Sequence, residues 1–544
     1  MAIIVTPNLS PISLCNESTT SWSSDNGGTT ASNGDVPVEG TYCVQNYASN
    51  NTTRGARLDF GGAGGIDMRN QIIYIWFSVS KIDNIPPYGA QGMRLRLVDT
   101  SSNWSEWDLF GGDTLPHGGW QPWAIGLAVS PSRSSATPAN LQYVRYVGWR
   151  CGDTTNVTAK TYIYWDAVRY GTGLKITGGT SGTPATWEDF YSADNVTNKY
   201  GVITKDQGIY YIQGEIVIGD ASQSAITYFK DTGKIIVFRN SIVTSTRYKI
   251  QAVGNGTYKT SFVLGSKSGT VGVGGGTIFS ANSSKPVSLD FDDTNLDDFG
   301  LYGVNVISGG TTTFPTAAAN HEVLNTTFNT CGLITASTCV IKNCNIIGCT
   351  GRALQLPGTT HNLSDSVFID NVYAIYANFD SEDPDLSLSN VKFYGSNGSS
   401  KYDLDHGGSG GNLDVSCTDT SNMNDSYVYE SGGGSTDVIN NVNLIIDCEN
   451  SSGSYLVGIK CGIYKQSDNT ELMNEDTVET LVGGSYKGRA VQPFNYPGSD
   501  VPVYVKIRRS SDGSTRYRPI STTGTITSTG FSLTAVLEVD EVAS

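Results

Sequence analysis

The stretch HEVLNTTFNTCGLITASTCVIKNCNIIGCTG, residues 321–351, contains four of the chain's ten cysteines. Cysteines this close together are typical of a zinc site, a disulfide cluster or a redox site. Their offsets of 8, 5 and 5 residues fit poorly with the two closely spaced pairs that a structural zinc site uses. The spacing therefore favours buried structural thiols, with a disulfide between stacked coils or a metal site as alternatives.

Four segments of this part of the chain align in one register, with successive offsets of 18, 22 and 25 residues. The segments are 323–331, 340–349, 362–371 and 387–396. Three aligned positions keep their character: a turn residue, a large apolar residue and a small residue. They are Asn325, Asn343, Asp365 and Asn390; Phe328, Ile346, Phe368 and Phe393; and Cys331, Cys349, Asn371 and Ser396.

A repeat of about 20 residues with conserved apolar and turn positions predicts a right-handed parallel β-helix. Each coil of such a fold adds short strands that stack about 4.8 Å apart, so equivalent side chains form ladders. The Phe and Ile positions would fill the interior. Asn and Asp suit the turns, because they tolerate the left-handed backbone conformation. Cys331 and Cys349 would then be neighbouring members of one ladder of small residues.

The composition of the whole chain favours an all-β protein. Glycine accounts for 63 of 544 residues and charged residues for only 16 %, and short Val, Ile and Tyr runs are separated by turn residues. All nine tryptophans precede residue 188, which marks a change in composition. We predict a jelly-roll-like β-sandwich over residues 1–175, a β-helix over 176–452 and a small β-domain that caps the coils over 453–544.

Two segments illustrate the predicted flanking domains. In MRLRLVD, residues 93–99, apolar and basic residues alternate, as in a strand with one buried face. In residues 501–513 the alternation of Val503, Val505 and Ile507 with polar residues, followed by SSDG, predicts a hairpin. An open β-helix end exposes unpaired strand edges, so a terminal β-domain would also protect the last coil.

Charge and hydropathy exclude several classes of function. A net charge of −16 repels nucleic-acid phosphates, so we expect no nucleic-acid partner. No stretch approaches the ~20 apolar residues that span a bilayer, so we expect no membrane insertion. The first residues lack the features of a signal peptide. We therefore expect synthesis in a cytoplasm, where thiols stay reduced. The sequence shows no nucleotide-binding or metal-binding motif, and we expect no cofactor.

Asp290 and Asp292 are the candidate catalytic residues, within the acidic segment SLDFDDTNLDDFG. If both lie on one strand, their Cα atoms share a face about 7 Å apart, a separation that suits the acid and base of an inverting glycosidase. Carboxylate oxygens could also hold Ca²⁺, but the calcium-loop pattern fails at Thr294 and lacks its glycine, so we expect no metal site. A solvated turn is the simplest alternative.

Four tryptophans are candidates for glycan binding. Trp104 and Trp107 flank a polar Ser-Glu pair, and Trp120 and Trp123 flank Gln-Pro. Exposed indole rings stack on the apolar face of a sugar ring, whereas buried ones only fill a sandwich core. A spacing of three places the two members of each pair on opposite faces of a strand. At most one tryptophan of each pair is therefore expected to face solvent.

Several segments resemble known families. TYIYWDAVRYG (161–171) resembles the last strand of jelly-roll carbohydrate-binding modules, and GGWQPWAIGL (118–127) resembles another of their strands. The order of a jelly-roll-like domain, a parallel β-helix and a small β-domain is similar to tailspikes, fibres and other surface proteins of tailed bacteriophages. Residues 501–531 look like the C-terminal β-domain of such proteins.

The resemblance implies a homotrimeric virion surface protein that contacts other virion proteins and attaches to host-surface polysaccharide. We therefore expect a tail-fibre-like structural protein on the virion surface. The first alternative is a tailspike depolymerase, a polysaccharide hydrolase or lyase that uses carboxylates of the β-helix. The second is a capsid decoration, cement or head-fibre protein. The sequence leans toward a non-enzymatic role, because no catalytic pair matches the family residue by residue.

Overall fold

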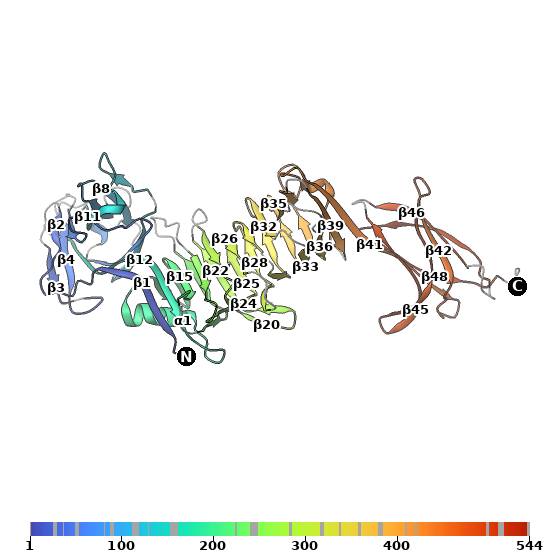
Figure 1. Ribbon diagram of the computed structural model, residues 1–544, viewed down its shortest axis with the longest axis horizontal. Coiled ribbons are helices and arrows are strands. Elements are labelled where there is room, and N and C mark those ends of the chain that lie inside the picture. The colour runs from blue at the N-terminus through green and yellow to red at the C-terminus, as the bar shows by residue number, and fades with distance from the viewer. Residues whose placement is uncertain are drawn as a thin grey trace. The chain divides into compact units, whose positions relative to one another are not determined.

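The structure is a computed structural model (Figure 1). It describes residues 2–540 except 26–29, 36, 49–53, 81, 88–91, 111–118, 129, 153–160, 223–225, 240–248, 282–285, 316–319, 337–338, 357–360, 379–384, 409–410, 419–420, 497–499 and 510–515. The chain forms two compact units, Met1–Cys339 and Val340–Ser544. Strands dominate both units, which confirms the all-β class. Among the described residues, no helix has the length and hydrophobicity needed to cross a membrane.

The first unit begins with a β-sandwich of two antiparallel sheets. Between them lies a core that includes the fully buried Trp107, Trp149 and Trp165, and Trp149 packs edge-on against Trp165 with ring centroids 4.9 Å apart. The first sheet contains β1 (Ile4–Ser13), β3 (Ala31–Asn33), β4 (Cys43–Ala48), β6 (Ile72–Val79), β9 (Gln121–Gly126) and β12 (Thr161–Thr177). The second has the order β10 (Arg133–Ser134), β8 (Trp104–Phe110), β7 (Met93–Asp99), β11 (Val144–Cys151), β5 (Arg54–Asp59) and β2 (Ser23–Asp25).

Strand β12 belongs to both the sandwich and the first coil. Its first part pairs antiparallel with β4 and β6. Its last part, from Gly173 to Ile176, pairs in parallel with β15 (Glu215–Gly219). Backbone hydrogen bonding therefore runs without interruption from one part of the unit into the other. The short helix α1 (Trp187–Tyr191) and the π-helix η3 (Ser192–Asn198) follow, and Trp187 and Phe190 pack against Phe229 at the start of the coil core.

The coils of the first unit add parallel strands to three sheets in turn, as successive pairings show. One sheet contains β14 (Ile209–Ile212), β17 (Ile235–Phe238), β22 (Gly276–Ser280), β25 (Val304–Ile307) and β28 (Thr327–Asn329), with β13 (Ile203–Asp206) antiparallel at its edge. The second contains β15, β18 (Lys249–Val253), β23 (Val287–Asp290), β26 (Gly309–Thr313) and β29 (Ile334–Thr335). The third contains β16 (Thr227–Asp231), β19 (Thr260–Leu264), β24 (Leu296–Tyr302) and β27 (His321–Leu324). After β19 in the chain, β20 (Ser266–Ser268) and β21 (Val271–Val273) form a separate two-stranded antiparallel sheet.

The second unit continues the same pairing pattern. Its first sheet contains β31 (Asn345–Ile347), β34 (Val367–Ile369) and β37 (Lys392–Tyr394), and its second contains β32 (Arg352–Leu356), β35 (Tyr373–Ala377), β38 (Tyr402–His406) and β40 (Val428–Tyr429). Its third contains β30 (Val340–Lys342), β33 (His361–Ser364), β36 (Asp385–Ser389), β39 (Asn412–Thr418) and β41 (Ser435–Asn450). Three parallel sheets that receive consecutive strands have the pairing pattern of a parallel β-helix. The handedness of the coil stays a prediction.

The predicted ladders agree with the register inside the second unit. Ile346 pairs with Phe368 and Phe368 with Phe393, whose rings stack 5.2 Å apart. The four turn positions adopt left-handed backbone conformations, with φ between 51° and 54°: Asn325, Asn343, Asp365 and Asn390. The ladder steps from Asn325, Phe328 and Cys331 to Asn343, Ile346 and Cys349 concern residues of different units and stay predictions.

All ten cysteines are buried thiols. The Asn371 side chain accepts a hydrogen bond from the Cys349 backbone amide at 3.0 Å and donates one to the Ile346 carbonyl at 2.8 Å. The small-residue position of the ladder is thus also a site where side chains satisfy backbone groups. The burial of Cys331, Cys339, Cys344 and Cys349 agrees with the interpretation as core thiols.

The second unit ends in two packed sheets. The second half of β41 pairs with β45 (Ser485–Asn495) and β48 (Phe531–Leu537), and β44 (Val478–Val482) extends this sheet. The other sheet has the order β43 (Glu471–Asp476), β42 (Ile459–Lys465), β46 (Val501–Arg509) and β47 (Ile520–Ile526). Strands β46 and β47 are antiparallel and Val503, Val505 and Ile507 are buried, as predicted. The SSDG turn lies outside the described residues.

Both flanking sandwiches therefore share a strand with the coils. The new pairing of β41 begins at Asn441, before the predicted domain boundary at 452/453, and β12 runs through the predicted boundary at 175/176. The boundaries themselves stay predictions.

Candidate functional site

The outward face of the second sandwich sheet gathers charged and aromatic side chains. On its strands, core residues such as Leu95, Trp107 and Val147 alternate with residues that point away from the core. Figure 1 labels β2, β8 and β11 of this sheet. We call the outward-pointing set the arginine face. Its members are Asp25, Arg57, Arg94, Arg96, Trp104, Glu106, Asp108, Arg133, Tyr146 and Arg150.

Cross-strand register places these residues next to one another. Gly148 on β11 stands between Arg57 on β5 and Arg96 on β7. Arg96 in turn faces Glu106 on β8. Two residues further along β11, Arg150 lies between Gly55 on β5 and Arg94 on β7. Because the middle strand carries a glycine in the first of these rows, β11 itself contributes no side chain between Arg57 and Arg96.

Two carboxylates hold three of the arginines in one network. Glu106 lies 2.6 Å from Arg96 and 3.1 Å from Arg94. Asp25 lies 2.9 Å from Arg150 and 3.7 Å from Arg96. Three guanidinium groups thus share two carboxylates. The pKa of Arg96 is lowered, first by burial and second by the positive charge of Arg150. Positive charge on this face is therefore incompletely compensated.

Several polar atoms of the face lack a hydrogen-bond partner among the described residues. They are the buried Nε atoms of Arg57 and Arg94 and the buried Oδ1 atom of Asp108. Arg94 is 6 % exposed and Asp108 is 7 % exposed. Arg57 forms no ion pair with any described residue, and its guanidinium lies over the Tyr146 ring, 4.7 Å from the centroid. A buried polar atom without a partner costs free energy, so such atoms mark places where a ligand or ordered water completes the bonding.

The predicted tryptophans are placed differently from one another. Trp104 is half-buried and points outward, with the guanidinium of Arg96 4.4 Å from its ring centroid. Trp107 is 1 % exposed and lies in the sandwich core, so its candidacy as a sugar-stacking residue is corrected. This is the opposite-face arrangement that a spacing of three predicted. Trp123 packs against the core from β9, and Trp120, just before that strand, is half-buried.

Asp290 and Asp292 do not share a strand. Strand β23 ends at Asp290, Phe291 is buried, and Asp292 lies exposed in the turn that follows. Asp290 accepts hydrogen bonds from Gln251 at 3.1 Å and Thr313 at 3.3 Å on the neighbouring coils. The expectation that both carboxylates lie on one strand is therefore wrong, since the turn begins directly after Asp290. Their catalytic role stays a prediction.

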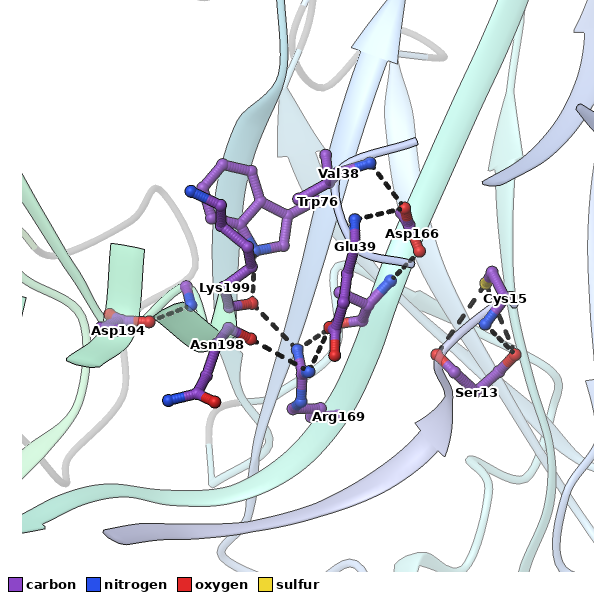
Figure 2. A network of polar contacts seen from close by, with 12 residues as sticks. Ser13, Cys15, Val38, Glu39, Trp76, Asp166, Arg169, Asp194, Asn198 and Lys199 are labelled. Carbon is purple, nitrogen blue, oxygen red and sulfur yellow. Dashed lines mark hydrogen bonds and ion pairs between the residues drawn. The ribbon is translucent and has the colours of Figure 1, made fainter. Parts of the chain in front are cut away.

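A second polar cluster, the junction cluster, joins the sandwich to the start of the coils (Figure 2). Arg169 on β12 pairs with Glu39, donates to the Lys199 carbonyl at 2.9 Å and lies over the Tyr200 ring. Asp166, also on β12, accepts from the backbone amides of Val38, Glu39 and Ala167. All these groups have partners within the protein, so the cluster serves the structure.

Two buried acids of the junction cluster have raised pKa values. Burial raises the pKa of Asp166 to about 6 and that of Asp194 to about 7. Asp194 accepts hydrogen bonds from the backbone amides of Gly201 and Ile203, which lower its pKa but do not offset burial. Within the described part of the chain, no group of three or more His, Cys, Asp or Glu residues is arranged to hold a metal ion.

The arginine face was not among the predicted sites. Its signal was present in MRLRLVD, where arginines alternate with core residues, and in the outward-pointing Gly148 and Arg150 of VGWRC. That alternation identifies a face, but it does not identify which strands of the sheet lie beside one another. The set became visible only when register brought together residues from β2 to β11.

Comparisons with known proteins give short structural matches. No family model matches the chain, and no curated protein does. An exo-β-agarase structure matches 30 % of this chain and 25 % of its own, at 9 % identity and a TM-score of 0.22. The C-terminal family 22 carbohydrate-binding module of Clostridium thermocellum Xyn10B matches 29 % and 90 %, at 15 % identity and a TM-score of 0.19. A family 11 carbohydrate-binding module from the same species, in complex with a β-1,3-1,4-mixed-linked tetrasaccharide, matches 28 % and 90 %, at 9 % identity and a TM-score of 0.20.

Proposed function

We propose that this chain is a glycan-binding attachment protein and that the arginine face of its N-terminal sandwich is the binding surface. The observation that carries the proposal is the set of buried, unpartnered polar atoms on that face: the Nε atoms of Arg57 and Arg94 and Asp108 Oδ1. Two donors and one acceptor are thus left without a partner in the described part of the chain. Sugar hydroxyls both donate and accept hydrogen bonds, so a glycan supplies what these atoms lack.

The half-buried aromatic residues support the same function. Trp104 stands on β8 and Tyr146 on β11, and each has an arginine against its ring. A rigid aromatic ring beside a guanidinium offers an apolar surface and charged donors within a few ångströms. Binding sites for polar ligands commonly combine such surfaces with a few placed polar groups.

A binding role is favoured over cleavage of the glycan. Asp290 and Asp292 lie on a strand end and in a turn, and Asp290 already accepts bonds from Gln251 and Thr313. The polysaccharide hydrolase or lyase stays the alternative, and it predicts new reducing or unsaturated ends when the protein is incubated with host polysaccharide. Their absence would support the binding role.

The setting that we propose is the surface of a tailed-bacteriophage virion, where the protein would act as a fibre-like trimer bound to other virion proteins. The order of a sandwich, parallel coils and a terminal β-domain supports this setting. Labelling intact particles with antibodies against the chain tests it. Label at the tail supports attachment, and label on the capsid shell supports the decoration or head-fibre alternative.

Binding is tested with the full chain immobilised and a panel of soluble neutral and acidic polysaccharides, measured by biolayer interferometry. Trp104→Ala and Tyr146→Ala should each weaken binding at least about tenfold, since they remove contacts of about 1.4 kcal/mol or more. Tyr486→Ala is the matched control, because Tyr486 is 57 % exposed and lies in the other unit. Full binding by both face variants, with unchanged thermal unfolding, would contradict the proposal.

A further inference from the structure

The charge of the arginine face differs from that of the rest of the chain. The chain carries a net charge of −16. Among the described residues, the face combines five arginines with three carboxylates, an excess of two positive charges. The arginines are Arg57, Arg94, Arg96, Arg133 and Arg150, and the carboxylates are Asp25, Glu106 and Asp108. The pair of Asp59 and Arg145 at the edge, 2.7 Å apart, is balanced. The local positive charge thus favours an anionic ligand, whereas the net negative charge of the whole chain repels one.

Arg57 and Arg96 are placed to hold one anionic group between them. They stand on β5 and β7, with Gly148 of β11 between them. Strands are ~4.8 Å apart, so their Cα atoms are about 10 Å apart. An arginine side chain is long enough to reach across such a gap, to which the glycine contributes no side chain. The Arg96 guanidinium lies against Glu106 and Trp104, and the Asp25 carboxylate, which reaches in from β2, lies 3.7 Å from Arg96. Arg57 has no carboxylate partner among the described residues, and the guanidinium groups of Arg57 and Arg96 lie over the rings of Tyr146 and Trp104.

The chemistry of the guanidinium group points to an oxyanion. Its planar fork matches the oxygens of a carboxylate or a phosphate and forms paired hydrogen bonds with them. Asp108 adds a further requirement, because its buried Oδ1 needs a donor, such as a hydroxyl. Chloride or sulfate supplies no such donor. A sugar acid supplies both a carboxylate and hydroxyl groups.

We propose that the arginine face selects an acidic polysaccharide that carries carboxylate groups, with Arg57 and Arg96 binding the carboxylate and Asp108 accepting a sugar hydroxyl. This inference rests on the proposed glycan-binding function and specifies its ligand class. Trp104 then acts chiefly by orienting Arg96, not by stacking on a neutral sugar.

The test compares one polymer with and without its charge. Polygalacturonate and the same polymer after chemical reduction of its carboxyl groups to alcohols are titrated against the full chain at 0.05 and 0.5 M NaCl. We expect polygalacturonate to bind at least tenfold more tightly than the reduced polymer at low salt, and this preference to shrink at high salt. Equal binding of the two polymers would overturn the inference and leave the proposed function standing. Absence of binding to any polysaccharide would overturn the proposed function itself.

Two variants assign the effect to the face. Arg57→Gln should remove most of the preference for polygalacturonate, and because Arg57 has no ion pair among the described residues, folding should be retained. Arg69→Gln is the control, since Arg69 lies on the same unit and pairs with Asp67 on the surface, 2.6 Å away. An unchanged preference in Arg57→Gln would overturn the assignment.

Two further measurements separate other occupants of the face. Dextran sulfate, compared with dextran, tests a general response to polyanions, and equally strong binding of dextran sulfate and polygalacturonate would overturn the selection for carboxylate. Light scattering after size-exclusion chromatography reports the oligomeric state. A smaller oligomer for Arg57→Gln would overturn the inference by showing that a second copy of the chain covers the face.

Discussion

Arg169 of the junction cluster and Arg57 of the arginine face both lie in the N-terminal sandwich, but their bonding differs. Arg169 is 5 % exposed, and its donors reach Glu39 and the backbone carbonyls of Ala167, Asn198 and Lys199. The buried Nε atom of Arg57 has no partner among the residues that the structure describes, and its guanidinium contacts chiefly the Tyr146 ring. Two arginines in one domain thus differ in how many of their hydrogen-bond donors have partners among the described residues.

The difference separates structure from binding. A fully bonded buried charge holds elements together, and here it ties β12 to the last residue of η3 and to Lys199 after it. A cluster that contains donors or acceptors without partners can form further hydrogen bonds with a ligand. The same residue type therefore serves a structural role at the junction and is available for recognition on the face. The following predictions test that distinction through stability, from the largest effect to the smallest.

Arg169→Met should cause the largest loss. It removes the guanidinium but keeps an unbranched apolar stem, and it leaves Glu39 and several carbonyls without their donor. Breaking a buried pair in this way costs roughly 3 kcal/mol. Chemical denaturation at pH 7 measures the free energy of unfolding. Arg69→Met, at an exposed pair, should show no measurable change. Equal losses in both variants would remove the distinction between the junction and the surface.

Asp194→Asn should change how stability depends on pH. Burial raises the pKa of Asp194 to about 7, from an ordinary value of 3.8. The folded protein then keeps a proton that the unfolded chain has lost, so this contribution is complete below about pH 4 and is lost as the pH rises through about 7. The variant has no such titration. Its stability relative to the natural chain should therefore rise by up to about 1.4 kcal/mol per pH unit in that window.

Unfolding measured at pH 4.5, 5.5 and 6.5 for both chains gives the slope. Asp166, whose pKa is about 6, titrates in both proteins and largely cancels in the difference. Parallel stability curves would show that Asp194 is ionised in the folded protein throughout this range.

Arg57→Gln should cause the smallest loss of stability, below about 1 kcal/mol, because it removes one cation–π contact and no ion pair. The same substitution is expected to cause the large loss of preference for acidic polymer described above. Chemical denaturation compares it with Arg169→Met under identical conditions. A loss as large as that of Arg169→Met would show that the face is a structural cluster like the junction.

Local patterns in the sequence determined the parts of the fold that depend on periodicity. Asn343, Asp365 and Asn390 were predicted as turn residues and have positive φ, because their side chains tolerate that backbone. Phe368 and Phe393 were predicted as one interior column and stack, since equal offsets within coils place equivalent residues in register. The buried alternation of Val503 and the residues after it followed from the two-residue period of a strand.

Other features were decided by where strands end and which strands lie side by side. Asp290 and Asp292 have strand-like spacing in the sequence, but β23 ends at the first of them. The sharing of β12 and β41 between sandwich and coils was not predicted, because a boundary based on composition cannot show that one strand pairs with two partners.

The arginine face depends most on tertiary structure. The period of two in MRLRLVD determined that Arg94 and Arg96 point away from the core. It could not determine that Arg57 and Arg150 would lie next to them, because β5, β7 and β11 are far apart in the chain and are brought together only by sheet register. The sequence alone determined the repeat and the direction of each side chain, whereas the tertiary structure decided which charges meet and which remain without a partner.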